Sequence, residues 1–469
     1  MSPTMAAATA GPDTVPSLPT ALACAGCGYR LPDNEPIRLR CPMARAGDDT
    51  DHVLRRVIEP SRLSFPSEQD LNPFVRYRTL LHGYHVALAA GLSDGDVAQL
   101  IRRLDHAVAG VDGHGFEVTP FARADRLSEQ LGLGPQGGIW VKDETGNVSG
   151  SHKARHLFGV LLELELAGGE IGSSAHPLAI ASCGNAALAA AVVARAAGRP
   201  LHVFIPPDAD PWVVARLRAL GTDPVVCERE PGATGDPTYH RLREEIARGA
   251  IPFTCQGNLN GLAIEGGETL GWEMVSATLA SGERLDDLVI QVGGGALASS
   301  CIQAFSEARD LGVLSALPRF HTVQTRGASP LARAHELVAA RLPEGADVAA
   351  IEGELTRAAT HRSEFMWPWE TEPHSVAGGI LDDETYDWLA VVRGMLLTGG
   401  QAVVVDEAAL RDANRHARAS TGTEVDHTGS AGLAGAIELL RRGEIGPDDR
   451  VAVIYTGIRR AAASDGEPS

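Results

Sequence analysis

From residue 139 onward, short β-branched segments of the chain alternate with Ala- and Leu-rich segments of helical length. Strands separated by helical runs of about 10–15 residues are typical of βαβ units, in which helices cover a parallel sheet. The alternation therefore predicts an α/β fold with parallel sheets, with ligands at the carboxyl ends of the strands. We expect strands at 139–144, 178–182, 201–205, 224–227, 288–292, 320–324, 401–405 and 451–455, and helices at 186–197, 211–220, 296–310 and 407–419.

Size and charge argue against several classes of protein. The chain has 469 residues, and single cores rarely grow beyond about 250–300 residues, so we expect more than one domain. The formal net charge is −19, and no block of lysine or arginine offers a footprint for nucleic acid. Neither a membrane-spanning apolar run nor a secretory signal is evident. We expect no nucleic-acid or membrane partner, and a disordered Pro- and Ala-rich tail at 1–20.

Seven irregularly spaced cysteines fit reduced thiols in the cytoplasm better than a disulfide framework. Residues 21–60 look like a small separate module, in which Cys24 and Cys27 form a CxxCG knuckle and Cys41 follows. Zinc ribbons use thiolates at this spacing, but a tetrahedral site needs a fourth ligand and no second CxxC is present. His52 or an aspartate of the acidic turn beside it could complete a zinc site. A knuckle that packs without metal stays an open alternative.

Lys153 follows the short segment 148–152 and begins a helical stretch that extends to Leu166. Taken alone, a lysine at the start of a helix is usually a solvated surface residue. In a cleft beside phosphate-binding backbone, however, a lysine amine can condense with an aldehyde cofactor. The motifs elsewhere in the chain decide between these two interpretations.

A second strand-to-helix turn contains Ser182, Cys183, Gly184 and Asn185. The N–H groups and the dipole at the start of a helix stabilise a carboxylate or a phosphate. The amide of Asn185 can also hydrogen-bond a ring oxygen. An ordinary N-cap by Ser182 or Asn185 explains the same residues equally well.

Three consecutive glycines, Gly293, Gly294 and Gly295, follow a predicted buried strand and precede a helix of small residues. Their amides can converge on one phosphate without obstruction from a Cβ atom, although a plain tight turn is the alternative. The spacing does not match GxGxxG, and the Lys-Ser/Thr ending of a nucleotide P-loop is missing. A nucleotide- or dinucleotide-binding domain is therefore disfavoured.

Thr456 lies at the end of the last predicted strand, where its hydroxyl could fill a core position or hydrogen-bond an aromatic nitrogen. In chain order, the lysine, the asparagine turn, the triple glycine and this hydroxyl resemble the fold type II (tryptophan synthase β-like) family of pyridoxal-phosphate enzymes. That family includes threonine synthase, threonine and serine dehydratases, and cysteine synthase. The resemblance covers roughly residues 115–460, and segments 264–270 and 424–435 are similar to two further family motifs.

The resemblance implies two doubly wound parallel-sheet domains beside the small N-terminal CxxCG module. The larger domain, which carries the glycine loop, is expected to comprise 61–145 and 265–469. The smaller domain, which carries the asparagine turn, is expected at 146–264. A homodimer is also expected, on the family resemblance alone.

Individual roles follow from the resemblance as well. Lys153 would be the catalytic residue, because it would carry pyridoxal 5'-phosphate as a Schiff base and act as the base at the substrate α-carbon. The other cofactor contacts would be Asn185 at the ring 3-oxygen, Gly293, Gly294, Gly295, Ala296 and Leu297 at the phosphate, and Thr456 at the pyridine nitrogen. The substrate contacts would be Ser151, Arg155, Ser182, Cys183, Gly184 and Ala186, and the candidate metal ligands Cys24, Cys27 and Cys41.

A neutral hydroxyl at the pyridine nitrogen makes the ring a weaker electron sink, so loss of a β-substituent is favoured over transamination. The resemblance thus implies a threonine synthase-like or dehydratase-like lyase of amino-acid metabolism, acting on a small hydroxy- or O-phospho-activated α-amino acid. A β-replacement synthase and a catalytically silent relative are the alternatives. Threonine synthases usually have Ser-Phe-Lys-Asp-Arg where this chain has residues 151–155 as Ser-His-Lys-Ala-Arg, so the substrate stays open. No chemistry is assigned to the insertion 339–369.

Overall fold

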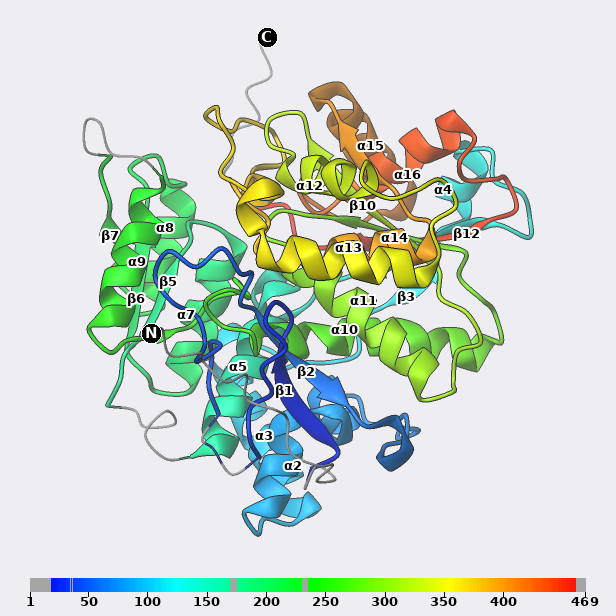
Figure 1. Ribbon diagram of the computed structural model, residues 1–469. Helices are drawn as coiled ribbons and strands as arrows, with labels where there is room; N and C mark the ends of the chain where they lie inside the picture. The colour runs from blue at the N-terminus through cyan, green and yellow to red at the C-terminus, as the bar shows by residue number, and fades with distance from the viewer. Residues whose placement is uncertain (1–17, 34, 36, 169–174, 230–234, 461–469) are drawn as a thin grey trace, which may run out of the picture.

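Two sheets and a small N-terminal ribbon organise the computed structural model, which describes residues 18–33, 35, 37–168, 175–229 and 235–460 (Figure 1). The larger sheet has six strands, and every pair in it is parallel except β3 with β4. The smaller sheet has four parallel strands. In spatial order the larger sheet contains β11 (Ala402–Val405), β10 (Arg319–Thr325), β9 (Asp287–Gln291), β12 (Arg450–Tyr455), β4 (Gly138–Asp143) and β3 (Phe121–Arg123). The smaller contains β7 (Val225–Val226), β6 (Leu201–Ile205), β5 (Leu178–Ala181) and β8 (Ile251–Pro252).

Helices cover both sheets, and in Figure 1 the smaller sheet with its helices lies on the left and the larger on the right. Along the chain, α1 (Pro73–Arg76), α2 (His82–Ala89) and α3 (Asp94–Asp112) precede the larger sheet. Between β3 and β4 lies α4 (Asp125–Gln130), which contacts β4 and α15. After β4 come α5 (Lys153–Ala167), α7 (Asn185–Ala196), α8 (Pro211–Ala219) and α9 (Pro237–Ala247). The remaining helices are α10 (Ala263–Ser281), α11 (Ala296–Asp310), α12 (Pro330–Ala339), α13 (Val348–Thr360), α14 (Trp388–Thr398), α15 (Glu407–Thr421) and α16 (Ala431–Arg442).

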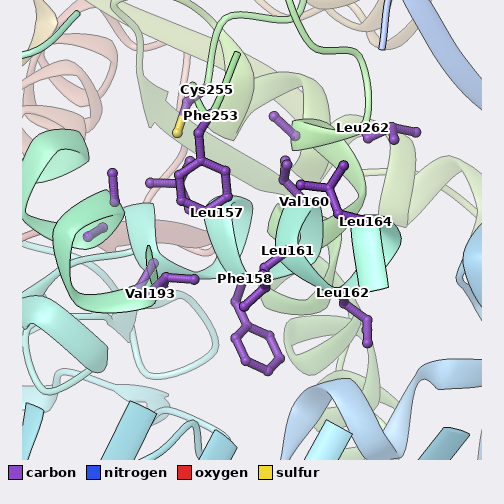
Figure 2. Packing of buried hydrophobic residues seen from close by; sticks show 14 of the residues in the cluster. Leu157, Phe158, Val160, Leu161, Leu162, Leu164, Val193, Phe253, Cys255 and Leu262 are labelled. Atoms are coloured by element: carbon purple, nitrogen blue, oxygen red, sulfur yellow. The ribbon is translucent and has the colours of Figure 1, made fainter. Parts of the chain in front are cut away.

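The α5 helix is buried on almost all of its faces, because apolar residues occupy most of its positions. Leu157, Phe158 and Leu161 pack there with Val193 of α7 and Phe253 after β8 (Figure 2). Its Gly159 allows α10 to approach closely, since a Cβ atom at this position would lie 2.5 Å from the Cα of Gly266. This packing fixes the helix that begins with Lys153.

The N-terminal module is built on the antiparallel ribbon of β1 (Thr20–Cys24) and β2 (Leu54–Ile58). Residues 1–17 of the expected tail lie outside the described residues, and Thr20, which was placed in that tail, already begins a strand. Short 3-10 turns occur at η1 (Pro60–Arg62), η2 (Arg78–Leu80), η3 (Val148–Gly150), η4 (Arg362–Glu364) and η5 (Gly378–Ile380).

The predicted fold class is confirmed, and the predicted strands lie within one or two residues of the observed ones. The strands β1, β2, β3 and β8 were not predicted; β3 and β8 span only three and two residues, and β1 and β2 belong to the N-terminal module, for which no strand was predicted. The insertion 339–369 contains α13 and η4. Within the described ranges, no helix has both the length and the apolar character needed to cross a lipid bilayer. The proposed domain limits stay a prediction.

Candidate active site

A cavity of about 520 Å³ lies where the carboxyl ends of β5, β9 and β12 meet the start of α5. This edge is where ligands bind in open α/β sheets. Motifs that lie far apart in the sequence come together around the cavity. The residues predicted for the site that line it are Lys153, Ser182, Cys183, Gly184, Asn185, Ala186, Gly293, Gly294, Gly295, Ala296, Leu297 and Thr456. Their individual roles stay predictions.

The turn before Lys153 is tied to the end of β12. His152 donates to the carbonyl oxygen of Thr456 from its backbone N–H and from ring Nδ1, both at 3.1 Å. Ser149 adopts a left-handed conformation with φ 58°, which is uncommon for a residue with a side chain, and its N–H donates to Asp112 at 2.7 Å. These bonds place Lys153 at the N-terminus of α5, directly beside the end of β12.

The hydroxyl of Thr456 is oriented by Gln291. The side-chain Nε2 of Gln291 donates to Thr456 Oγ1 at 3.0 Å, and also to the carbonyl oxygens of Gly429 at 2.8 Å and Ile454 at 3.0 Å. A hydroxyl has a single proton to donate. Since Gln291 occupies a lone pair of Thr456, that proton is left to donate to an acceptor in the cavity, such as an aromatic nitrogen.

The glycine turn forms a cup that leaves no room for side chains. A Cβ atom at Gly294 would lie 2.9 Å from the ring of Tyr386, and one at Gly295 would lie 2.9 Å from the methyl group of Thr385. Gly295 also has φ 99°, in the left-handed region that favours glycine. The carboxylate of Asp382 lies over the cup, since a Cβ atom at Gly293 would be 2.3 Å from its Oδ2, and the backbone of Gly294 acts to lower its pKa, so the amides of the cup face an acidic oxygen. The donor set therefore fits a phosphate.

Three polar side-chain atoms of residues in the cavity wall are buried and have no partner among the described residues. They are Oδ1 of Asn185, Oε1 of Gln256 and Oε1 of Gln291. Asn185 begins α7 and lies against the end of β12, where a Cβ atom at Gly457 would be 2.8 Å from its Nδ2. Buried polar atoms are nearly always satisfied, so these amides fit a polar ligand rather than an empty space.

The histidines beside Lys153 are neutral. Burial, and then the nearby Lys153 charge, hold the pKa of His152 well below its ordinary value and lower that of His156 to about 3. By contrast, burial raises the pKa of Asp382 to about 6, although Lys153 acts in the opposite direction. The two histidines of this part of the site thus carry no charge near neutral pH.

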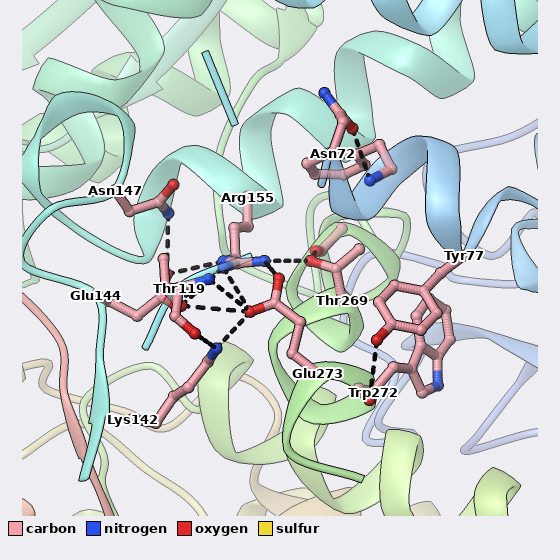
Figure 3. Close-up of polar contacts among 12 residues, drawn as sticks. Asn72, Tyr77, Thr119, Lys142, Glu144, Asn147, Arg155, Thr269, Trp272 and Glu273 are labelled. Atoms are coloured by element: carbon pink, nitrogen blue, oxygen red, sulfur yellow. Dashed lines mark hydrogen bonds and ion pairs between the residues drawn. The ribbon is translucent and has the colours of Figure 1, made fainter. Parts of the chain in front are cut away.

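Arg155 does not contact the cavity, which contradicts its expected role as a substrate contact. Its guanidinium is fully shielded from solvent and donates to Glu144 through Nε at 2.8 Å and to Glu273 through Nη1 at 2.6 Å (Figure 3). Thr119 and Thr269 accept further bonds from it. Because all its donors face this network, none is left for a substrate. Ser151 is fully buried as well and does not line the cavity.

Sequence reasoning did not identify several residues of the cavity wall. Asp208 follows β6, so its place after a strand could have revealed it. Asp382 and Tyr386 lie in an irregular segment after η5, where no periodic pattern exists to locate them. Asp236 precedes α9 and has the appearance of an ordinary N-cap.

The cysteines of the N-terminal module converge with His52. One ligand atom from each of Cys24, Cys27, Cys41 and His52 lies within 4.8 Å of the others. The sulfur atoms of Cys27 and Cys41 are 3.7 Å apart, and Cys24 Sγ is 3.4 Å from His52 Nδ1. The other ring nitrogen of His52 lies 2.8 Å from a carboxylate oxygen of Asp48. His52 is therefore the fourth residue of this cluster of candidate metal ligands.

Comparisons with known proteins agree on one family. A family model described as "Pyridoxal-phosphate dependent enzyme" matches residues 114–457. A threonine synthase from Methanosarcina acetivorans is 25% identical over 362 residues, which is 72% of this chain and 74% of the relative. A cysteate synthase from Methanoculleus marisnigri is 27% identical over 463 residues, which is 95% of this chain and 89% of the relative.

Solved structures show the same fold. The structure of maize serine racemase superposes with a TM-score of 0.55 at 18% identity, and covers 78% of this chain and 94% of its own. A processed threonine deaminase from Solanum lycopersicum gives a TM-score of 0.55 at 17% identity, with 79% and 92% covered.

Proposed function

Because the chain belongs to the family of pyridoxal-phosphate dependent enzymes, we propose that it is a lyase that catalyses β-elimination on a small α-amino acid. The observation that carries the proposal is that Lys153, the Asn185 turn, the glycine cup and Thr456 all line one cavity. Relatives named threonine synthase, cysteate synthase and probable D-serine dehydratase support an activity of this class.

Different residues of the cavity would bind the cofactor and the substrate. When bound, pyridoxal phosphate supplies an electron sink for negative charge at the α-carbon of an amino acid. The amides of 293–297 would hold its phosphate, Asn185 its ring oxygen, and the free proton of Thr456 its pyridine nitrogen. The N–H groups at the start of α7, with Ser182, would bind the substrate carboxylate.

Proton transfer falls to Lys153. Its amine lies in the cavity wall, where it can take the α-proton once the substrate carboxylate is held at the α7 turn. His152 stays neutral and bonded to the Thr456 carbonyl, so it positions the turn and does not compete for that proton. A hydroxyl at the pyridine nitrogen does not enforce ring protonation, and this favours expulsion of a β-substituent.

A substrate screen tests the activity. Protein purified with pyridoxal phosphate should show an absorbance band at roughly 400–430 nm. It should release keto acid and ammonia from at least one member of a set that includes serine, threonine, homoserine and their O-phospho forms. The same assay with added thiol or sulfite distinguishes β-replacement, because the acceptor would then bond to the β-carbon in place of the leaving group, giving a new amino acid and less keto acid and ammonia. The absence of both the absorbance band and any turnover would refute the proposal. Lys153→Ala serves as the inactive control.

We also propose that Cys24, Cys27, Cys41 and His52 bind zinc. A tetrahedral site with Zn–S bonds of about 2.3 Å separates its sulfur atoms by about 3.8 Å, and Cys27 and Cys41 are 3.7 Å apart. The contact of His52 with Asp48 also supports zinc, since a carboxylate commonly orients a metal-bound histidine.

Metal analysis tests the zinc site. We expect about one zinc per chain, as for a single closed four-ligand site, and its loss in Cys27→Ser. Cys227→Ser removes a thiol outside the module and should keep the metal. A metal-free preparation whose thermal stability is unaffected by added zinc would argue for a knuckle that packs alone.

Family resemblance further leads us to propose a homodimer, located in the cytoplasm. None of the seven cysteines forms a disulfide, which supports a reducing compartment. Light scattering coupled to size exclusion distinguishes a dimer from a monomer.

A further inference from the structure

The charged residues of the cavity wall are mostly acidic. Four aspartates line it, namely Asp208, Asp210, Asp236 and Asp382. Lys153 and His152 are the basic side chains of the lining, as far as the described residues go; the pKa of His152 is held well below its ordinary value, and no arginine is present there. The guanidinium nearest in sequence, Arg155, is committed to its buried network.

Two of the four aspartates also have structural roles. Asp210 caps α8 by accepting from the N–H of Trp212 at 2.7 Å, and Asp236 caps α9 by accepting from the N–H of Thr238 at 2.8 Å. Asp382 caps no helix and forms no ion pair with any described residue. Its carboxylate lies over the glycine cup, where a Cβ atom at Gly293 would be 2.3 Å from its Oδ2, and both Asp382 and Lys153 line the cavity.

Three of the carboxylates gather around the turn that would hold the substrate carboxylate. Burial raises the pKa of the Cys183 thiol, and the charges of Asp208, Asp236 and Asp382 raise it further. These carboxylates are contributed by three different segments, one after β6, one before α9 and one after η5. The negative charge is thus concentrated in the cavity wall, beside the turn and the glycine cup where a substrate and the cofactor would bind.

Bound ligands would add further negative charge. The cofactor phosphate at the glycine cup and the substrate carboxylate at the α7 turn are both anions. A phosphorylated side chain would bring an additional charge of about −1.5 to −2 into the same cavity. Without a guanidinium to receive it, that group would face the aspartates directly.

We propose that Asp382, together with Asp208 and Asp236, selects α-amino acids whose side chain carries a positively charged nitrogen, the smallest being 2,3-diaminopropionate. This inference rests on the proposed β-elimination. In that step Lys153 takes the α-proton, and the C–H electron pair becomes the Cα=Cβ double bond. The Cβ–N bond breaks with its electron pair on nitrogen, so the bound ammonium leaves as ammonia. Water then converts the enamine product to pyruvate and a second ammonia.

The test uses the holoenzyme and two aspartate variants. Diaminopropionate should give two ammonia per pyruvate, and its kcat/KM should exceed that of O-phosphoserine by about 100-fold or more, as expected when a charge meets its counter-charge in place of a like charge. Asp382→Asn should lower kcat/KM for diaminopropionate at least about tenfold more than for serine. Asp383→Asn is the matched control, because this neighbour does not line the cavity.

A binding measurement separates recognition from turnover. L-2,4-Diaminobutyrate carries the side-chain ammonium but has no leaving group on its β-carbon, and L-2-aminobutyrate is its uncharged counterpart. Calorimetry with Asp382→Asn should show about a tenfold rise in Kd for the diamino acid and a smaller change for the neutral one.

Three results would overturn the inference. One is a preference for O-phosphoserine over diaminopropionate, and another is an equal loss of both diamino and neutral binding in Asp382→Asn. In either case turnover of serine or O-phosphoserine would leave the proposed elimination intact. The third is a protein without the cofactor band and without turnover of any amino acid, which refutes the proposed function and the inference with it.

Discussion

Arg155 and Glu144 form a two-pronged ion pair in the interior, in which Nε donates to Oε2 at 2.8 Å and Nη2 donates to Oε1 at 3.0 Å. Both side chains are completely shielded from solvent. Glu273 accepts from the same guanidinium and also from Lys142, so two cations and two carboxylates balance one another behind the cavity (Figure 3). The network joins α5, α10 and the end of β4.

Removing the arginine should affect folding more than substrate affinity. Arg155→Met leaves two buried carboxylates short of a partner, and breaking a buried pair in this way costs about 3–5 kcal/mol. Urea unfolding should show that loss. Arg415→Met is the control, because Arg415 and Asp412 pair on the surface and such a change is worth about 0.5 kcal/mol or less. If Arg155→Met kept native stability but had a raised KM, Arg155 would be a substrate contact after all.

The contact between α5 and α10 makes a second stability prediction. In Gly159→Ala the new methyl group would meet the Cα and N atoms of Gly266 at 2.5 and 2.8 Å. Helix backbones must then separate, at a cost of about 1–3 kcal/mol. Gly353→Ala, in α13, meets no atom within 4 Å and should stabilise by about 0.4–1 kcal/mol. Equal effects of the two substitutions on the unfolding midpoint would contradict this packing.

His156 should make the protein sensitive to acid. Its Nδ1 donates to the carbonyl of Ala263 at 2.7 Å, and the charged groups facing it are Lys153 and Arg155. Its folded-state pKa, about 3, is below the ordinary value of 6.5. Below about pH 6.5, His156 is therefore protonated in the unfolded chain but not in the folded chain. The free energy of unfolding decreases as the pH falls through about 6.5.

The variant His156→Gln isolates this effect. Between about pH 7.5 and pH 5, the wild type should lose roughly 2 kcal/mol more stability than the variant. Buried aspartates with raised pKa values, such as Asp382 and Asp387, act with the opposite sign but equally in both proteins. If the wild type and the variant lose equal stability over this pH range, the pKa of His156 is the same in the folded and unfolded chains, which would contradict the prediction.

Thr456 should contribute to cofactor affinity through its hydroxyl. Thr456→Val removes the hydroxyl and leaves Nε2 of Gln291 without one of its acceptors. We expect the Kd for pyridoxal phosphate to rise about tenfold, which corresponds to one hydrogen bond, whereas Thr456→Ser should bind nearly as well as the wild type. An absorbance titration measures both. Unchanged affinity in the valine variant would remove Thr456 from the binding set.

The fold could be predicted from the sequence where buried strands of ordinary length alternate with helices, from residue 139 onward. The strand β9, for example, is buried at every position, and the predicted segment 288–292 differs from it by one residue at each end. The two-residue strand β8 carries no such pattern, because its neighbours in the sheet supply its pairing.

Candidate site residues were predictable where they follow a strand or begin a helix, as Lys153, Asn185 and Gly293 do. Arg155 was misjudged because a sequence does not reveal that Glu144 and Glu273 meet it from two other elements. Asp382 was missed because only the folded chain brings its irregular segment over the glycine cup.

The central claim is that one amine, that of Lys153, carries the cofactor. Reducing the holoenzyme with borohydride and mapping its peptides by mass spectrometry tests it most directly. We predict a single phosphopyridoxyl label on Lys153, in the peptide that begins α5. A label on another residue, or none at all, would contradict the account.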